Sequence, residues 1–271
     1  RIIDGGYEVQ ADPNDPDNPI RAILSALRNM FDGDVDGPIM QGAYVMVMCP
    51  QGMPGIPATP WAQGNVSFYP EAYHERQSYH MHEVGHNYEL GHASMGNQRY
   101  GDITGYMGAN AGDYLSCYSG SKSWRLGWYD DRVLEVEADA EVTVPMVGIA
   151  DYNASGIAPS DVVILKVDDP AAYAENYFVR FNRKSGINAQ TQDAQDQVAI
   201  QRQYDHYSAS DMVAKMDAGE SYTIVWQSAP FNTTVHVCSI DLDAEPARAI
   251  VAVKRYDGSS ISCDFSPPPP S

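Results

Sequence analysis

Five of the seven histidines of the chain lie in one short stretch, between His74 and His92. Within this stretch stands His82-Glu83-Val84-Gly85-His86, which places two histidines four residues apart. On a helix, residues at this spacing share a face, so both imidazoles can reach one metal ion while the carboxylate between them contacts a water on that ion. His92 supplies a third imidazole ten residues after His82. The pattern predicts a metal site with three nitrogen ligands.

Three neutral imidazoles suit zinc, which prefers nitrogen ligands in a tetrahedron and leaves the fourth corner to water in catalytic sites. Other divalent metals also accept this ligand set. Because the ligands carry no charge, the pKa of a bound water can fall far below that of bulk water, towards about 7. Glu83 would then take a proton from the attacking water and deliver it to a leaving amine, while the metal stabilises the oxyanion. Peptide hydrolysis requires all of these functions.

A second motif follows the histidines. Residues 101–108 read Gly-Asp-Ile-Thr-Gly-Tyr-Met-Gly, and Leu126-Gly127-Trp128 and the strand-like segment Asn176–Phe181 come later. Together with the spaced histidines, these residues resemble the metzincin metalloproteases. More narrowly, they resemble the gametolysin family of secreted proteases, in which His-Glu-x-Gly-His-Asn and a Gly-Asp…Met-Gly segment recur.

The resemblance implies zinc bound by His82, His86 and His92, with Glu83 as the general base. It also implies that Met107 lies in a Met-turn beneath the metal, in a structural rather than a ligating role. Gametolysins are associated with extracellular-matrix and cell-wall glycoproteins, so a protein or glycoprotein substrate is the implied partner.

One position departs from the metzincin pattern. Seven residues after the first histidine, where the chain leaves the helix, the consensus has glycine, but this chain has Glu89 and its next glycine is Gly91. A non-glycine residue at positive φ costs about 1 kcal/mol or more, so either Glu89 accepts that strain or the helix ends later, at Gly91. Glu89 is also a competing ligand, although a ligand from the same helix is poorly placed for a tetrahedron.

Three further acidic or phenolic candidates allow two interpretations each. Tyr106 is either a core tyrosine, which we favour, or a donor to an oxyanion or a metal-bound water. Asp102 either anchors the Met-turn loop or orients a ligand histidine through a hydrogen bond, with equal support. Asp32-x-Asp34-x-Asp36-Gly37 matches the opening of a calcium loop, but Ala43 stands where a bidentate Glu belongs. A solvated acidic turn is therefore favoured over a Ca²⁺ site.

The elements that must position these residues change in character at about residue 131. Before it, helices and strands alternate, with helices expected at 20–31 and from 71 to about 89 and strands at 44–49 and 65–69. After it, short strands follow one another with turn signals between them, which is typical of a β-sandwich.

We therefore expect an α/β metzincin-like catalytic domain over residues 1–131, with a mixed sheet and a long active-site helix. A β-rich, sandwich-like domain is expected over 132–265. The polyproline segment 266–271 is expected to begin a linker.

Composition excludes several classes of protein. The 271 residues carry 36 acidic and 17 basic side chains, a formal net charge of −19, which disfavours binding to nucleic acid or to anionic membrane surfaces. No apolar run approaches the roughly 20 residues that a membrane helix requires. With 44% hydrophobic residues, the chain is too apolar to be disordered.

Cysteines and glycosylation motifs favour a secreted protein. No Cys-x-x-Cys pair occurs, and the even number of cysteines allows two disulfides, for which we expect one bridge in each domain: Cys49–Cys117 and Cys238–Cys263. Three acceptor motifs for N-glycosylation occur, at Asn65, Asn153 and Asn232. No apolar signal segment follows Arg1, so we expect that any signal peptide has been removed.

We predict a secreted, monomeric zinc endopeptidase. One alternative is a non-catalytic glycoprotein that binds cell-wall polymers and keeps a vestigial metal site, although the intact Glu83 argues against it. Another alternative keeps the zinc but cleaves an amide bond outside a peptide.

Overall fold

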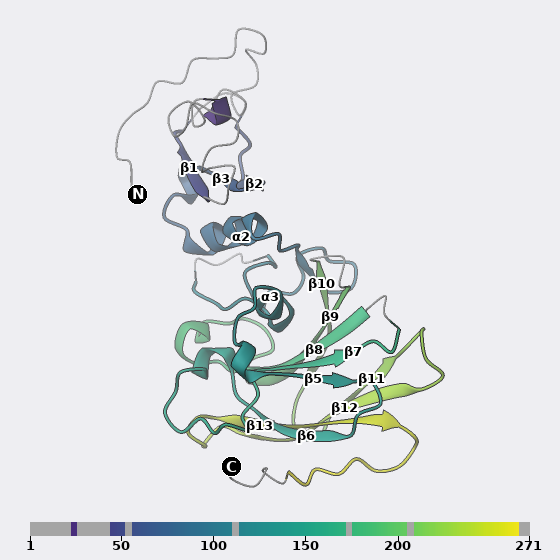
Figure 1. Cartoon of the computed structure of the whole chain (residues 1–271). Helices are drawn as coiled ribbons and strands as arrows, with labels where there is room; N and C mark the ends of the chain where they lie inside the picture. Colours follow the sequence, from purple (N-terminus) through teal and green to yellow (C-terminus); the bar gives the residue numbers. More distant parts are fainter. Residues whose placement is uncertain are drawn as a thin grey trace. The chain divides into compact units, whose positions relative to one another are not determined.

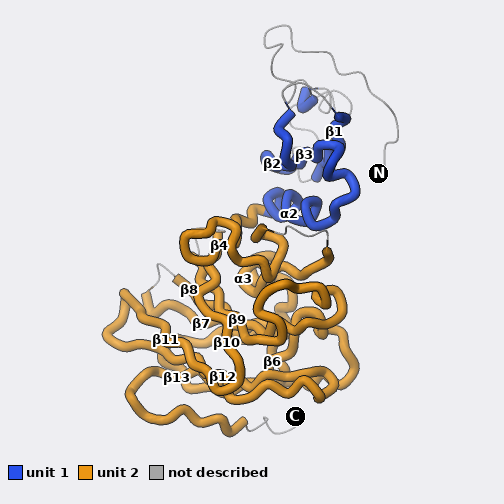
Figure 2. Tube along the Cα trace, turned by 180° about the vertical axis from the view of Figure 1, so that it is seen from behind, with its two compact units in different colours: residues 1–88 blue, residues 89–271 orange. Residues whose placement is uncertain are grey.

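A computed structural model describes residues 23–25, 44–51, 56–109, 114–171, 175–204 and 209–265. The chain divides into two compact units, residues 1–88 and 89–271 (Figure 2). Of the helix expected at 20–31, residues 23–25 are helical and the rest lies outside the described residues. The acidic turn at 32–37 and the proline-rich segment 266–271 also lie outside them.

The first unit contains a mixed three-stranded sheet. Its strands stand in the order β1-β3-β2, with β1 parallel and β2 antiparallel to β3; their bounds are Val45–Cys49 (β1), Trp61–Gln63 (β2) and Val66–Pro70 (β3). Apolar side chains on these strands form the core, in which the rings of Trp61 and Phe68 stack with centroids 4.3 Å apart.

The helix that carries the histidine motif is shorter than expected. A 3₁₀ turn, η1, occupies Glu71–Tyr73, and the α-helix, α2, runs over the 11 residues Gln77–Asn87. Between them, His74 Nε2 lies 3.1 Å from the carbonyl oxygen of Cys49 and 3.0 Å from that of Tyr69. These contacts hold the turn against the ends of β1 and β3, which interrupts the helix expected to begin at Glu71.

The second unit is built from two sheets (Figure 1). One has six strands in the order β4-β10-β9-β8-β7-β5, and the other has four in the order β11-β12-β13-β6. The bounds are Ala93–Ser94 (β4), Val133–Glu137 (β5), Val142–Met146 (β6), Ile164–Asp168 (β7), Glu175–Asn182 (β8), Gln197–Tyr204 (β9), Ser210–Met216 (β10), Ser221–Val225 (β11), Asn232–Asp241 (β12) and Arg248–Tyr256 (β13). Side chains from both sheets form one large hydrophobic cluster. The short helix α3, Gly120–Arg125, contacts β8 and β9.

Only one of the two expected disulfides forms among the described residues. Cys238 of β12 is bonded to Cys263 as expected, but Cys49 and Cys117 are buried free thiols, so the expected Cys49–Cys117 bridge is wrong. Each thiol packs into a separate hydrophobic cluster. Burial raises the pKa of both, to about 11 for Cys117, which keeps them protonated.

Among the described residues, no helix combines the length and the apolar character needed to span a bilayer.

Candidate metal centre

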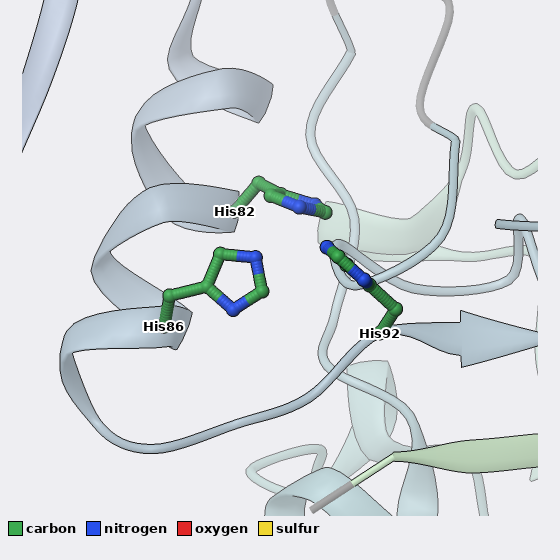
Figure 3. A group of neighbouring side chains, drawn as sticks. All are labelled: His82, His86 and His92. Atoms are coloured by element: carbon green, nitrogen blue, oxygen red, sulfur yellow. The ribbon is translucent and has the colours of Figure 1, made fainter. Parts of the chain in front are cut away.

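Three histidines bring their ring nitrogens together. His82 and His86 lie one turn apart on α2, with ring centroids 4.8 Å apart and ring planes at 85°. One ring nitrogen from each of His82, His86 and His92 lies within 4.8 Å of the other two. Figure 3 shows the three rings pointing toward one another.

This arrangement fits a zinc ion. Nitrogen ligands at about 2.0–2.1 Å around a tetrahedral zinc lie about 3.3–3.4 Å from one another. The three nitrogens lie no more than 4.8 Å apart, so small rotations of the half-buried side chains can bring them to this spacing. The donor set and its spacing therefore suit a metal ion that takes nitrogen ligands.

The turn after α2 decides between the two expectations for Glu89. The helix ends at Asn87, and the backbone N–H of Tyr88 donates to the carbonyl oxygens of Val84 and Gly85. Glu89 follows with φ +62°, and Gly91 is not among the residues with positive φ. Glu89 thus adopts the left-handed conformation itself. Its side chain is exposed and does not belong to the group of ligand atoms.

The backbone around His92 is held by two neighbouring segments. The carbonyl oxygen of His92 accepts a hydrogen bond from the Ser210 N–H at 3.0 Å, where β4 pairs with β10. On the next residue, the Ala93 N–H donates to the Met107 carbonyl oxygen at 2.8 Å and the Ala93 carbonyl oxygen accepts from the Asp102 N–H at 3.2 Å. The loop 101–108 therefore supports the segment that carries the third histidine.

Glu83 is almost completely removed from solvent, with 5% of its surface exposed. Burial disfavours its charged form and raises its pKa from 4.5 to about 7. A carboxyl group with a pKa near neutrality is well suited to accept a proton and return it.

The sequence model of the family described as gametolysin peptidase M11 matches residues 58–224, more than half of the chain. The chain belongs to this family. The match includes the three histidines, Glu83 and the loop 101–108, and it extends through most of β11. The family assigns the chain to the metallopeptidases and confirms the resemblance drawn from the sequence. No curated protein and no solved structure matches the chain.

In this gametolysin-family chain, a buried polar network fastens the loop 101–108 to the six-stranded sheet. One carboxylate oxygen of Asp102 accepts hydrogen bonds from the backbone N–H and the hydroxyl of Thr104, and the other accepts from the side-chain amide of Gln201 in β9. The guanidinium of Arg180 in β8 donates to the Thr104 carbonyl oxygen at 3.0 Å and to its hydroxyl at 2.6 Å. Through these contacts Asp102 links the loop 101–108 to β9.

Tyr106 and Met107 are both buried, with 3% and 1% of their surfaces exposed. The Tyr106 hydroxyl accepts a hydrogen bond from the Ser116 N–H at 2.9 Å, and its ring lies edge-on to that of Tyr118. Burial raises the pKa of Tyr106. These contacts are those of a core tyrosine.

Some residues of the site were missed at the level of sequence. Arg99 Nε donates to His92 Nδ1 at 3.1 Å, and this nitrogen is one of the two on the His92 ring that could bind a metal. The ring centroids of Tyr100 and His92 lie 4.3 Å apart. Arg180 is buried in β8 between the apolar residues Val179 and Phe181. A charged residue in such a strand is a signal that could have identified it, because buried arginines need specific partners.

A second group of potential ligands does not form a metal site. It consists of His236, Cys238 and Cys263, but the two sulfurs are joined in the disulfide and offer no thiolate. Of the glycosylation motifs, Asn153 is exposed, and Asn65 and Asn232 are half-buried.

Proposed function

We propose that this gametolysin-family chain is a secreted, zinc-dependent endopeptidase. The observation that carries the proposal is that three imidazole nitrogens lie close together. The residue that follows His82 in α2 is the buried Glu83. His82, His86 and His92 would hold the ion. When bound, zinc supplies a Lewis acid that polarises the scissile carbonyl and acidifies water.

Glu83 takes the proton of the attacking water and returns it to the leaving nitrogen. Its burial supports this role, because a raised pKa lets the same carboxylate bind the proton after the first step and release it in the second. We assign Met107 and Asp102 to the support of the third histidine, through their backbone contacts with Ala93.

The substrate we propose is a protein or glycoprotein of an extracellular matrix or cell wall. We retain the division into a catalytic domain over 1–131 and a β-rich, sandwich-like domain over 132–265. The pairing of β4 with β10 gives the later strands a part in supporting the His92 segment. N-glycosylation at Asn65, Asn153 and Asn232, and a monomeric state, belong to the same proposal.

The test is hydrolysis of labelled casein and gelatin by the zinc-loaded protein. We expect activity that a chelator abolishes and added zinc restores. Glu83→Gln keeps the shape of the side chain but removes the base, so kcat/KM should fall about 10²- to 10⁴-fold while one zinc per chain is retained. Glu89→Gln, at the exposed turn residue, is the matched control and should keep full activity.

Activity that survives the chelator or the Glu83→Gln substitution would contradict the proposed mechanism. A wild-type protein that binds zinc but cleaves neither substrate would favour the non-catalytic alternative. Cleavage of amidated sugars in place of peptides would favour an amidase.

A further inference from the structure

A cavity of about 330 Å³ lies on the second unit, away from the hydrophobic cluster that the two sheets share. Along β11, β12 and β13, successive side chains point to opposite faces of the sheet. Ile224, Val235 and Val253 belong to the shared cluster, and the residues next to them in each strand lie on the opposite face. The cavity is lined from this opposite face and by residues of the segment that follows β13.

The floor of the cavity is polar and ordered by strand register. Thr234 pairs with Thr223 on one side and with Lys254 on the other, so two hydroxyls and one ammonium form a row across three strands. In the next row, the Ser221 hydroxyl and His236 Nδ1 are hydrogen-bonded at 2.8 Å.

Thr234 gives the independent sign that a ligand belongs here. Only 7% of its surface is exposed, and its hydroxyl oxygen has no hydrogen-bond partner among the described residues. A buried hydroxyl without a partner costs free energy, and a ligand that supplies the missing hydrogen bond removes that cost.

The charge of the lining distinguishes it from the rest of the chain. The protein carries a net charge of −19, but none of the described residues that line the cavity is acidic, and Lys254, Arg255 and His236 are basic. The Lys254 ammonium donates to the Ser259 hydroxyl at 2.6 Å; the nearest carboxylates, of Glu141 and Asp257, lie at 3.7 and 3.9 Å and belong to exposed side chains outside the lining. The ammonium also donates to the Ser260 carbonyl oxygen at 3.5 Å. Because it has three N–H donors, one of them is left to donate to a further anionic oxygen.

The walls add an aromatic surface and a fixed edge. Tyr256 lines the cavity with 58% of its surface exposed, which offers a platform for the apolar face of a sugar ring. Ser259 and Ile261 also line the cavity. The segment that carries them is joined to β12 by the Cys238–Cys263 disulfide. It is also joined to β6, where the Thr143 hydroxyl donates a hydrogen bond to the Ser262 carbonyl oxygen.

We propose that this cavity binds a saccharide unit that carries an acidic group, with hydroxyl contacts from Thr223 and Thr234, a charged contact from Lys254 and stacking on Tyr256. The acidic group is either a carboxylate or a sulfate ester, because both present anionic oxygens to the same ammonium. The site is separate from the metal centre and does not depend on the proposed peptidase activity.

The experiment is a calorimetric titration of the whole chain, as the Glu83→Gln variant, with three probes of equal length: oligogalacturonate, a sulfated galactan oligosaccharide and neutral galactan oligosaccharide. We expect at least one acidic probe to bind about tenfold or more tightly than the neutral one, with the same affinity in zinc-loaded and metal-free protein. The better of the two acidic probes identifies the carboxylate or the sulfate as the preferred group.

Two variants and one control locate the binding. Lys254→Gln should weaken acidic-probe binding about tenfold, since hydrogen bonds to charged groups are the stronger ones. Thr234→Val should weaken it about threefold or more without lowering folding stability, because the hydroxyl that it removes has no partner in the part of the chain that the structure describes. Lys184→Gln, at an exposed lysine outside the lining, should leave it unchanged.

Equal affinity for acidic and neutral probes, no binding at millimolar concentration, or an unchanged affinity in Lys254→Gln would each overturn the proposal. Binding that disappears when zinc is removed would assign the saccharide to the metal centre instead. None of these results would bear on whether the chain is a peptidase.

Discussion

The left-handed turn at Glu89 gives a prediction whose size follows from the backbone. Glu89 has φ +62° and an exposed side chain, and it connects the end of α2 to the segment that carries His92. A non-glycine residue in this conformation costs about 1–2 kcal/mol. Glycine removes that cost but loses about 0.5–1 kcal/mol more conformational free energy on folding. Glu89→Gly should therefore stabilise the protein by up to about 1.5 kcal/mol, with about 0.75 kcal/mol at the centre of the range.

The assay is urea denaturation of the metal-free protein, with zinc affinity measured in parallel. Glu75→Gly is the matched control, because Glu75 is also exposed but does not have positive φ. The control should be destabilised by about 0.5–1 kcal/mol. Zinc affinity should change less than about threefold in Glu89→Gly, since the turn keeps its conformation. If both substitutions destabilise the protein equally, the left-handed conformation at Glu89 is wrong.

Three further predictions concern Arg99 beside His92, Gln201 in the network that anchors the loop 101–108, and the buried Lys122 of α3. Arg99→Ala should raise zinc affinity about two- to fivefold in a competition titration, because the guanidinium occupies one nitrogen of His92 and repels the cation; unchanged or weaker affinity would contradict this. Gln201→Leu removes a donor to the buried Asp102 carboxylate, so unfolding free energy should fall by about 2 kcal/mol and zinc affinity about tenfold, whereas a loss of stability alone would separate the network from the metal centre. Burial lowers the pKa of Lys122 from 10.5 to about 7, so between these pH values the unfolded chain binds more protons and stability rises with pH, by up to about 1.4 kcal/mol per pH unit. Lys122→Met should lose this slope in urea titrations from pH 7 to 9.5, and an identical slope in both proteins would refute the assignment.

The sequence predicts what is local in this site. Helical periodicity alone brings His82 and His86 to one face of α2, and the family motif adds His92 and Met107. The short strands after residue 131 could also be recognised from the sequence, because short apolar segments are separated there by turn residues.

Contacts between segments that are far apart in the chain could not be predicted from the sequence. The Ser210 N–H donates to the backbone carbonyl oxygen of His92 from a strand more than a hundred residues later. The side-chain amide of Gln201 donates to the carboxylate of Asp102, 99 residues earlier in the chain. The wrong Cys49–Cys117 pairing has the same origin, since an even number of cysteines fixes no distance between them. The shorter α2 resulted from His74, whose hydrogen bonds to two strands replace a helical turn.

Anomalous diffraction at the zinc edge, from crystals grown with zinc, tests the central claim most directly. We predict one strong peak per chain, about 2.0–2.1 Å from a nitrogen of each of His82, His86 and His92. A chain without a peak at this position, or with a peak that His92 does not reach, would contradict the proposed metal centre.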